Sequence, residues 1–341
     1  MKLDVMTGGK KLRDVAQFAR DVEGAGLSGL VITESGRTPY LTATAAALVC
    51  NLDLATGVAV AFPRSPMVTA STAWELAELS GGRFRLGLGT QVRAHIERRY
   101  SSVFDQPGPR LREYVLALRA IFAAFQGSTK LDFHGEFYNF SLLPEAWSPG
   151  PIDHPNVPID VAAVGPWMTR MAGEVADGVH VHPFHSMTYL HETLLPAVTE
   201  GARIGGRSAA DVSLIVPVFT IVGDSEEARA PLKARAKSQI AFYGSTRNYA
   251  HIFDQVGFEG TSARLNERMK VGDMTGMADL ITDEMLEQFA VTSTWDELAG
   301  ALTAKYEGTA DRLVLYFAEL LWRSDPTGLA RLGEVAKALC G

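Results

Sequence analysis

Residues 158–183 read PIDVAAVGPWMTRMAGEVADGVHVHP. The stretch begins with a short apolar run, Ile159 to Val164, whose length and β-branched content predict a strand buried on both faces. After the turn at Gly165-Pro166, apolar side chains recur at the spacing of one helix face, at Met168, Met171, Ala172 and Val175. Asp177-Gly178 ends this helix, and a second strand is predicted over Val179 to Val181. The stretch therefore predicts one βαβ unit.

The turn at Val164, Gly165 and Pro166 places a helix start directly after the carboxyl end of a parallel strand. Unpaired backbone N–H groups and the helix dipole favour an anion at such a point, so a cofactor phosphate is one interpretation. The other is an ordinary connection with Pro in the first helical turn, which is common in α/β proteins. The turn alone leaves both interpretations open.

Strand-like and helix-like segments alternate along the whole chain. The predicted strands are Leu3–Met6, Leu27–Thr33, Leu52–Ala61, Arg83–Gly89, Ile159–Val164, Val179–Val181, Leu214–Val222 and Leu313–Phe317. Strict alternation requires a parallel sheet with helices outside, and eight units at this length fit a closed (β/α)8 TIM barrel better than an open sheet. We expect a single domain over residues 1–341, with an ordered excursion at 127–157 and an insertion at 243–289 between the seventh and eighth strands.

The seventh unit contains a proline within its predicted strand and a capping-box pattern before its predicted helix. Pro217 lies inside the seventh apolar run and weakens the prediction of a strand there unless the strand has a bulge. Asp224 with Glu227 three residues on resembles a capping box, which predicts a helix start.

Composition excludes several classes of function. The chain has 341 residues, 47% of them hydrophobic, and a net charge of -7, so it has no basic field for nucleic acid or an anionic membrane. Cys50 and Cys340 lack the spacing of a disulfide framework or a zinc site. No apolar segment has the length of a signal peptide or a membrane span. A cytoplasmic protein with a small-molecule partner is expected.

Polar residues at the strand ends are the candidates for chemistry. Gly89, Thr90 and Gln91 end the fourth strand at the barrel mouth, where a glycine lets the backbone approach a flat ring or a phosphate. His180 and His182 share one face of the sixth strand, and a histidine is the natural proton carrier beside a hydride transfer. We take His182 as the candidate, with a structural histidine as the alternative. A metal site is not expected, because no third ligand at fixed spacing is present.

Glu34 closes the second strand and is the second catalytic candidate, since it is placed to hydrogen-bond a ring or orient a substrate. The alternative is a surface carboxylate near a helix start. A basic loop is predicted after the fourth strand, with Arg93, His95, Arg98 and Arg99; it either meets an anionic cofactor or substrate or is simply solvated.

Several motifs together resemble one family. They are ATGVAV with FPRSP, LSGGRFRLGLGTQ, VPIDVAAVGPWMTRMAGEVADGV, IVGDSEEA and TWDELAGALTAKYEGTADRLVLY. In this order they resemble the luciferase-like flavin and deazaflavin oxidoreductases, a superfamily of (β/α)8 barrels. AGEVADGV and RFRLGLG with GTQVRAHIERR are similar to the branch that uses coenzyme F420, a deazaflavin.

The resemblance implies a cofactor site. Family members carry a non-prolyl cis peptide in the third strand against the tricyclic ring, and the matching bond here is Gly57-Val58. A plain strand glycine at a barrel bend is the alternative. The implied cofactor contacts are Gly57, Val58, Gly89, Thr90, Gln91, Val164, Gly165, Pro166, Trp167 and Met168.

The chain also departs from the family pattern. Deazaflavin dehydrogenases of sugar phosphates and alcohols pair a His after strand two with a Glu after strand four, and this chain has Ser35 and Val92 there. The resemblance implies hydride transfer between coenzyme F420 and a small organic substrate, at a CH–OH, C=C or C=N group, in a homodimer. An FMN-dependent luciferase-like monooxygenase is the alternative, and a non-catalytic cofactor-binding barrel is favoured only by the missing acid/base pair.

Overall fold

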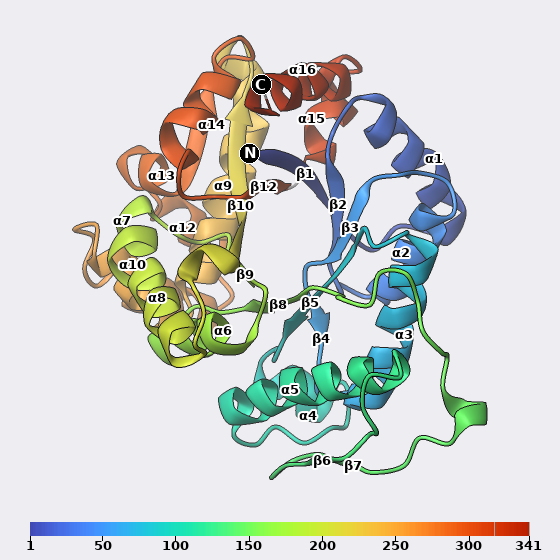
Figure 1. The fold of residues 1–341 in the computed structure, drawn as a ribbon. Helices are drawn as coiled ribbons and strands as arrows, with labels where there is room; N and C mark the ends of the chain where they lie inside the picture. Colours follow the sequence, from blue (N-terminus) through green and yellow to red (C-terminus); the bar gives the residue numbers. More distant parts are fainter. Residues whose placement is uncertain (317, 341) are drawn as a thin grey trace.

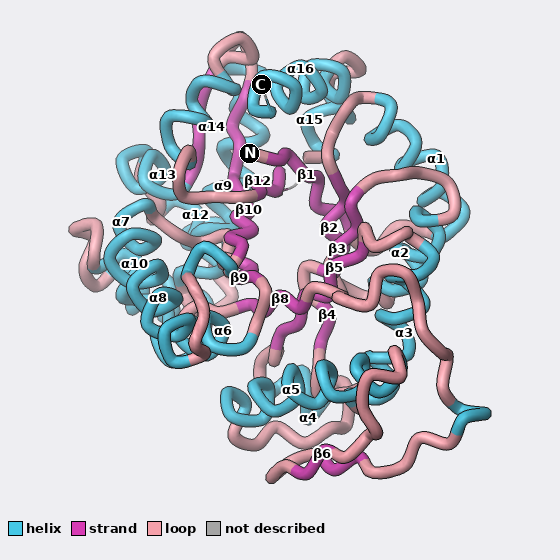
Figure 2. The backbone as a smooth tube through the Cα atoms, viewed as in Figure 1, coloured by secondary structure: helices cyan, strands magenta, loops and turns pink. Residues whose placement is uncertain are grey.

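In the computed structural model, which describes residues 1–316 and 318–340, parallel strands form a closed barrel surrounded by helices (Figure 1). The barrel strands, in order around the ring, are β1 (Lys2–Thr7), β2 (Gly29–Ile32), β3 (Asp53–Thr56), β5 (Phe84–Gly89), β8 (Ile159–Ala162), β9 (Gly178–His180), β10 (Ser213–Val222) and β12 (Arg312–Tyr316). Because β12 pairs with β1 and β9 pairs with β10, the ring closes. The predicted (β/α)8 barrel is confirmed, and Figure 2 shows its strands at the centre.

Helices cover the outside of the barrel. The main ones are α1 (Leu12–Gly24), α2 (Pro39–Ala47), α3 (Pro66–Leu79), α5 (Pro107–Phe125), α6 (Pro166–Val175), α7 (Met187–Tyr189), α8 (Leu195–Ile204), α9 (Glu226–Gly244), α14 (Leu298–Tyr306) and α16 (Gly328–Cys340). A π-helical turn, η2 (Leu190–Leu194), joins α7 to α8. Helices α6 and α8 can approach closely because Gly201 has no side chain. A Cβ atom at that position would clash with the carbonyl oxygen of Arg170. The helix of the predicted βαβ unit, α6, is therefore in close contact with α8.

The third strand is interrupted at the mouth of the barrel. The predicted strand Leu52–Ala61 consists of β3 and a separate short strand, β4 (Ala59–Val60), which pairs with β5. The peptide bond between them, Gly57-Val58, is cis, as the resemblance implied. Gly57 and Val58, at this interruption, both lie at the barrel mouth.

Strand β10 is continuous through Pro217, so the predicted weakness there is wrong. The ladder to β9 ends at Ile215, and the neighbouring strand β11 (Ala290–Ser293) begins to pair only at Phe219. Pro217 lies between these two ladders while β12 pairs along its other side. The missing N–H of proline therefore costs no ladder hydrogen bond. The sequence did not predict β11.

The two irregular regions both contain ordered structure. Residues 127–157 include the antiparallel pair β6 (Phe133–His134) and β7 (Asn139–Phe140) and the short helix η1 (Glu145–Trp147), and Trp74 Nε1 in α3 donates to the carbonyl of Gly150 at 2.9 Å. Residues 243–289 contain η4 (Arg247–Tyr249), α10 (Ala250–Asp254), α11 (Thr261–Lys270), α12 (Met274–Asp279) and α13 (Asp283–Phe289). The single-domain organisation stays a prediction.

Three local predictions need correction or comment. The hydroxyl of Ser225 caps α9 by accepting from the N–H of Ala228, whereas Asp224 accepts from the N–H of Trp295. The predicted basic loop begins with a short helix, α4 (Arg93–Arg98), stabilised by an i,i+4 ion pair between Arg93 and Glu97. A short helix, α15 (Glu319–Ser324), follows the last strand and was not predicted. Phe317, the predicted end of that strand, lies outside the described residues.

Candidate active site

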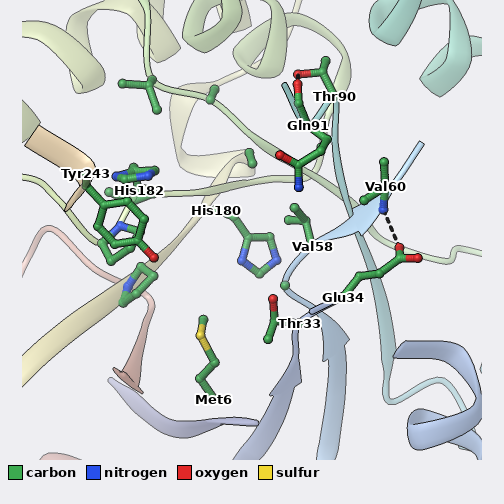
Figure 3. A pocket seen from close by; sticks show the side chains of 18 of the residues that line it. Met6, Thr33, Glu34, Val58, Val60, Thr90, Gln91, His180, His182 and Tyr243 are labelled. Atoms are coloured by element: carbon green, nitrogen blue, oxygen red, sulfur yellow. Dashed lines mark hydrogen bonds between the residues drawn. The ribbon is translucent and has the colours of Figure 1, made fainter. Parts of the chain in front are cut away.

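A cavity of about 350 Å³ opens at the carboxyl ends of the barrel strands (Figure 3). The predicted site residues that line it are Glu34, Gly57, Val58, Gly89, Thr90, Gln91, Val164 and His182. Gly165, Pro166, Trp167 and Met168 are not among its lining residues. They form the start of α6 next to it. The fold thus gathers eight predicted residues from five strand ends at one place.

One wall of the cavity is apolar and comes from the interrupted third strand and β5. The side chain of Val58 lies on this wall, and a Cβ atom on Gly89 would be 2.7 Å from Val58 Cγ2. A Cβ atom on Gly57 would be 2.1 Å from Val31 Cγ1. The two glycines therefore allow the backbone of adjacent strands and the Val58 side chain to pack into one surface.

Glu34 is held by hydrogen bonds on both carboxylate oxygens. Its Oε2 accepts from the N–H of Val60 at 2.8 Å and from Arg64 at 3.0 Å, and its Oε1 accepts from the other Arg64 nitrogen at 2.7 Å. The hydroxyl of Tyr100 adds a longer contact of 3.4 Å. Since only 6% of the side chain is exposed, this arrangement suits a group that fixes the bend after Val58 better than a group that exchanges protons with a substrate.

His182 lies on the opposite wall, in contact with two aromatic rings. The ring centroids of Tyr243 and Tyr249 are 4.7 Å and 4.8 Å from that of His182. The N–H of Phe184 donates to His182 Nδ1 at 3.1 Å, so the neutral ring carries its proton on Nε2. Burial, with a smaller effect of nearby His185, lowers the pKa of His182 to about 3. At neutral pH this residue is an uncharged hydrogen-bond donor.

His180 lies deeper in the same cavity and is 5% exposed. Its Nε2 atom has no hydrogen-bond partner among the described residues and lies 3.8 Å from a carboxylate oxygen of Asp160, which is itself paired with Arg85 at 2.6 Å. Burial lowers the pKa of His180 to about 4, although Asp160 opposes that shift. A Cβ atom on Gly87 would lie 2.6 Å from His180 Nε2, so this glycine makes room for the ring.

Gln91 and Thr90 follow β5 at the rim of the cavity. Gln91 has a left-handed backbone with φ +58, and its Oε1 accepts from the N–H of Val92 at 3.0 Å. The hydroxyl of Thr90 donates to the Gln91 carbonyl at 3.1 Å. Because the amide oxygen of Gln91 is used locally, its amide nitrogen is the group that points toward the cavity in Figure 3.

The start of α6 provides backbone donors without a side-chain cap. Gly165 is the N-cap residue, and a Cβ atom on it would meet nothing within 4 Å. The carbonyl of Val164 accepts from the hydroxyl of Tyr189 at 2.6 Å, which holds the turn in place. Trp167 packs over Gly108. The first-turn N–H groups of a helix have no partner within the helix, and no side chain caps them here. This geometry suits an anion beside the cavity.

Sequence reasoning missed three tyrosines that line the cavity. Tyr243 is the second-last residue of α9 and Tyr249 ends η4, both near the start of the insertion, where no strand pattern marks a position at the mouth. Tyr316 ends β12, and its hydroxyl lies 2.5 Å from that of Tyr243. Its place at a strand end was a usable signal, because every barrel strand ends at this face.

The architecture and the cavity define a class before any comparison. A closed parallel barrel with polar side chains converging at its carboxyl face is a TIM-barrel enzyme scaffold. Within that class, the chain belongs to the luciferase-like monooxygenase family, whose sequence profile matches residues 2–312.

Individual relatives extend this result. The chain is 43% identical over 310 residues to an uncharacterised protein of Mycobacterium tuberculosis, with 90% of this chain and 91% of the relative covered. It is 30% identical over 291 residues to the 5,10-methylenetetrahydromethanopterin reductase of Methanolobus tindarius, with 83% of each covered. The structure resembles the coenzyme F420 dependent tetrahydromethanopterin reductase of Methanopyrus kandleri with a TM-score of 0.78 at 18% identity, covering 99% and 96% of the two chains.

The described residues contain neither a cluster of metal-binding side chains nor a membrane-spanning helix. Across residues 1–316 and 318–340, no group of three or more His, Cys, Asp or Glu side chains is arranged to hold a metal ion. Within the same ranges, no helix combines the length and the apolar character needed to cross a membrane.

Proposed function

We propose that the protein is an oxidoreductase that transfers a hydride between coenzyme F420 and a small organic substrate at the barrel mouth. The observation that carries this proposal is the cavity at the barrel mouth with an apolar wall at Val58 and Gly89 on one side and the neutral donor His182 on the other. The similarity to a putative coenzyme F420-dependent oxidoreductase of Mycobacterium tuberculosis, 25% identical over 310 residues, supports the choice of cofactor.

The residues present fit a flat tricyclic ring. Val58, Val60 and Ala162 offer apolar contact from neighbouring strand ends, and Gln91 directs an amide nitrogen inward. The uncapped start of α6 at Gly165 suits the cofactor phosphate, with N–H groups of Trp167 and Met168 as donors. The ring would then lie across the strand ends with its tail over α6.

The cofactor, when bound, supplies a carbon that carries hydride, so the protein's own task is to bind, orient and supply hydrogen bonds. Glu34 holds the N–H of Val60 and thereby fixes the wall behind the ring. His182 donates from Nε2 toward the substrate, where it polarises an oxygen or nitrogen as a neutral imidazole. Tyr243 and Tyr249 hold the imidazole ring in place and restrict water around it.

Titration of the purified apoprotein tests the cofactor. Micromolar binding of F420, about 8 kcal/mol, with no oxygen uptake by the reduced complex is expected. Binding of FMN in its place, with oxygen uptake, would support the alternative, an FMN-dependent luciferase-like monooxygenase. If neither binds, the non-catalytic barrel gains support.

The reacting group is a separate question. The Methanolobus tindarius relative is named for a methylene carbon on tetrahydromethanopterin, and a structural neighbour at a TM-score of 0.74 is an F420-dependent secondary alcohol dehydrogenase. A panel of secondary alcohols and methylene tetrahydropterins, followed by F420 absorbance, distinguishes CH–OH from C=N chemistry. We expect turnover with only one of the two groups.

We also propose a homodimer. Leu41 in α2 and Leu48 at the C-cap of that helix lie seven residues apart and are 54% and 66% exposed, and Val68 in the adjacent α3 is 56% exposed. Large apolar side chains gathered on two packed helices are typical of a protein interface. Light scattering should give twice the chain mass, and Leu48→Glu should shift it to that of the monomer.

A further inference from the structure

A second cavity adjoins the first at the barrel mouth. It has a volume of about 730 Å³, and four residues line both cavities: Met6, Thr33, Tyr243 and Tyr316. The hydroxyl pair of Tyr243 and Tyr316, 2.5 Å apart, is part of this shared wall. The two cavities are therefore immediate neighbours along one shared wall.

The second cavity lies far from the turn proposed for the cofactor phosphate. It is lined by the loop after β1, the end of β2, helix α9 and the segment after β12. In the closed ring of eight strands, β8 is four positions from β1, so the loop after β1 is diametrically opposite the Gly165 turn. A cofactor tail anchored at Gly165 leaves this side of the mouth to another molecule.

The charges around the second cavity are mostly positive. Among the described residues that line it, Lys10, Arg235 and Arg323 are basic and Glu319 is the one carboxylate. Glu319 accepts from Lys10 at 2.7 Å, from the hydroxyl of Thr7 at 3.1 Å and from Arg323 at 3.3 Å. Three cations against one anion leave an excess of two positive charges, in a chain whose net charge is -7.

The local field is also partly shielded from solvent. The side chains of Lys10 and Glu319 are each 19% exposed, whereas Arg323 is 69% exposed and lies at the outer edge. Charges in a partly enclosed cavity are screened less by salt than charges on an open surface. The hydroxyl of Thr33 and the amide of Gln239 add neutral hydrogen-bonding groups to the same lining.

We propose that the second cavity binds an anionic tail of the substrate, a carboxylate or a phosphate, while the reacting carbon lies in the first cavity. Guanidinium and ammonium groups form their strongest hydrogen bonds with these two anions. This inference rests on the proposed function, since the first cavity must hold the cofactor ring. The protein would thus select substrates that carry a negative charge at one end.

Calorimetric titration of the apoprotein with citrate and with inorganic phosphate, at low salt, tests the site directly. Arg235→Gln and Arg323→Gln should each weaken binding about fivefold, the scale of a partly exposed ion pair. Lys233→Gln is the matched control, because Lys233 is on the same helix as Arg235, does not line the second cavity and pairs with Asp283 at 2.8 Å, and it should change nothing. Tighter binding of citrate indicates a carboxylate tail, and tighter binding of phosphate indicates a phosphate tail.

The outcomes separate this site from the cofactor. The proposal is overturned if neither anion binds, if both arginine variants bind as the wild type does, or if the two variants lose F420 affinity, since the cavity would then hold the cofactor's own tail. If F420 fails to bind the wild type but the anion pattern holds, the proposed function fails while the anion site is supported. Thermal midpoints of all variants verify that they are folded.

Discussion

The two walls of the first cavity are built in different ways. On the β4–β5 side, Glu34 makes hydrogen bonds to Arg64 and Val60, and glycines permit close backbone packing. On the β9 side, His182 is positioned mainly by the rings of Tyr243 and Tyr249, which come from the end of α9 and the insertion. The difference teaches that the wall proposed for the cofactor is fixed by polar bonds within the barrel, whereas the wall proposed for the substrate depends on aromatic packing from outside it.

The largest effect is expected from breaking the polar wall. Glu34→Ala leaves the guanidinium of Arg64 without its carboxylate partner, and loss of one member of such a pair typically costs about 3–5 kcal/mol when buried. Because the Arg64 side chain is 21% exposed, we expect about 3 kcal/mol of unfolding free energy, measured in urea.

Glu97→Gln is the control for Glu34, because it removes an exposed pair and should cost less than about 0.5 kcal/mol. Glu34→Gln separates the two roles considered for this residue. If that variant keeps its stability and F420 affinity but loses turnover, Glu34 acts on the substrate and the contrast between the walls is wrong.

The aromatic wall should respond in turnover and not in stability. His182→Asn removes the Nε2 donor, and we expect kcat to fall about 10²-fold, the scale of general acid/base catalysis, with F420 binding unchanged. Stopped-flow absorbance of the cofactor measures the hydride step. A loss of thermal stability that matches the loss of turnover would instead make His182 structural, and His180 would become the next candidate.

A single methyl group tests the apolar wall. Gly89→Ala places a Cβ atom 2.7 Å from Val58 Cγ2 and forces that side chain toward the ring position. We expect F420 affinity to fall about tenfold, since overpacking costs about 1–3 kcal/mol. Gly300→Ala is the control, because a Cβ atom there meets nothing within 4 Å. Unchanged F420 affinity in Gly89→Ala would show that the ring does not lie on this wall.

The smallest effect concerns pH. Burial lowers the pKa of His182 to about 3, below the ordinary value of 6.5, so the unfolded state binds more protons between these two values. Stability contributed by the neutral ring is therefore present above about pH 6.5 and is lost as the pH falls toward 3. The wild type should lose about 1 kcal/mol more than His182→Asn between pH 7 and pH 5.5. If the unfolding free energies of the wild type and His182→Asn, measured in urea, change equally with pH, the pKa of His182 is the same in the folded and unfolded states.

The barrel was predictable because each unit carries its own local pattern, as in the run from Ile159 to Val181. The strand-end candidates followed from the same logic, since parallel strands all end at one face. The hydrogen bonds that Glu34 accepts from Arg64 and Val60 were not predictable. They join residues about 30 positions apart, and secondary-structure propensity contains no information on such distant contacts. Tyr243 and Tyr249 were missed for a related reason: only the packing of the insertion brings them to the mouth.

Strand β10 pairs with two different strands along the same edge: its first residues pair with β9 and its last residues pair with β11. The chain that follows α9 thus returns to the sheet at Ala290 before it continues to α14 and β12. Residues 245–289, which lie between α9 and β11, therefore stand outside the ring of eight strands that closes the barrel. A change of sequence in this segment can alter the aromatic surface around His182, to which Tyr249 belongs, while the strand pairs that close the barrel stay as they are.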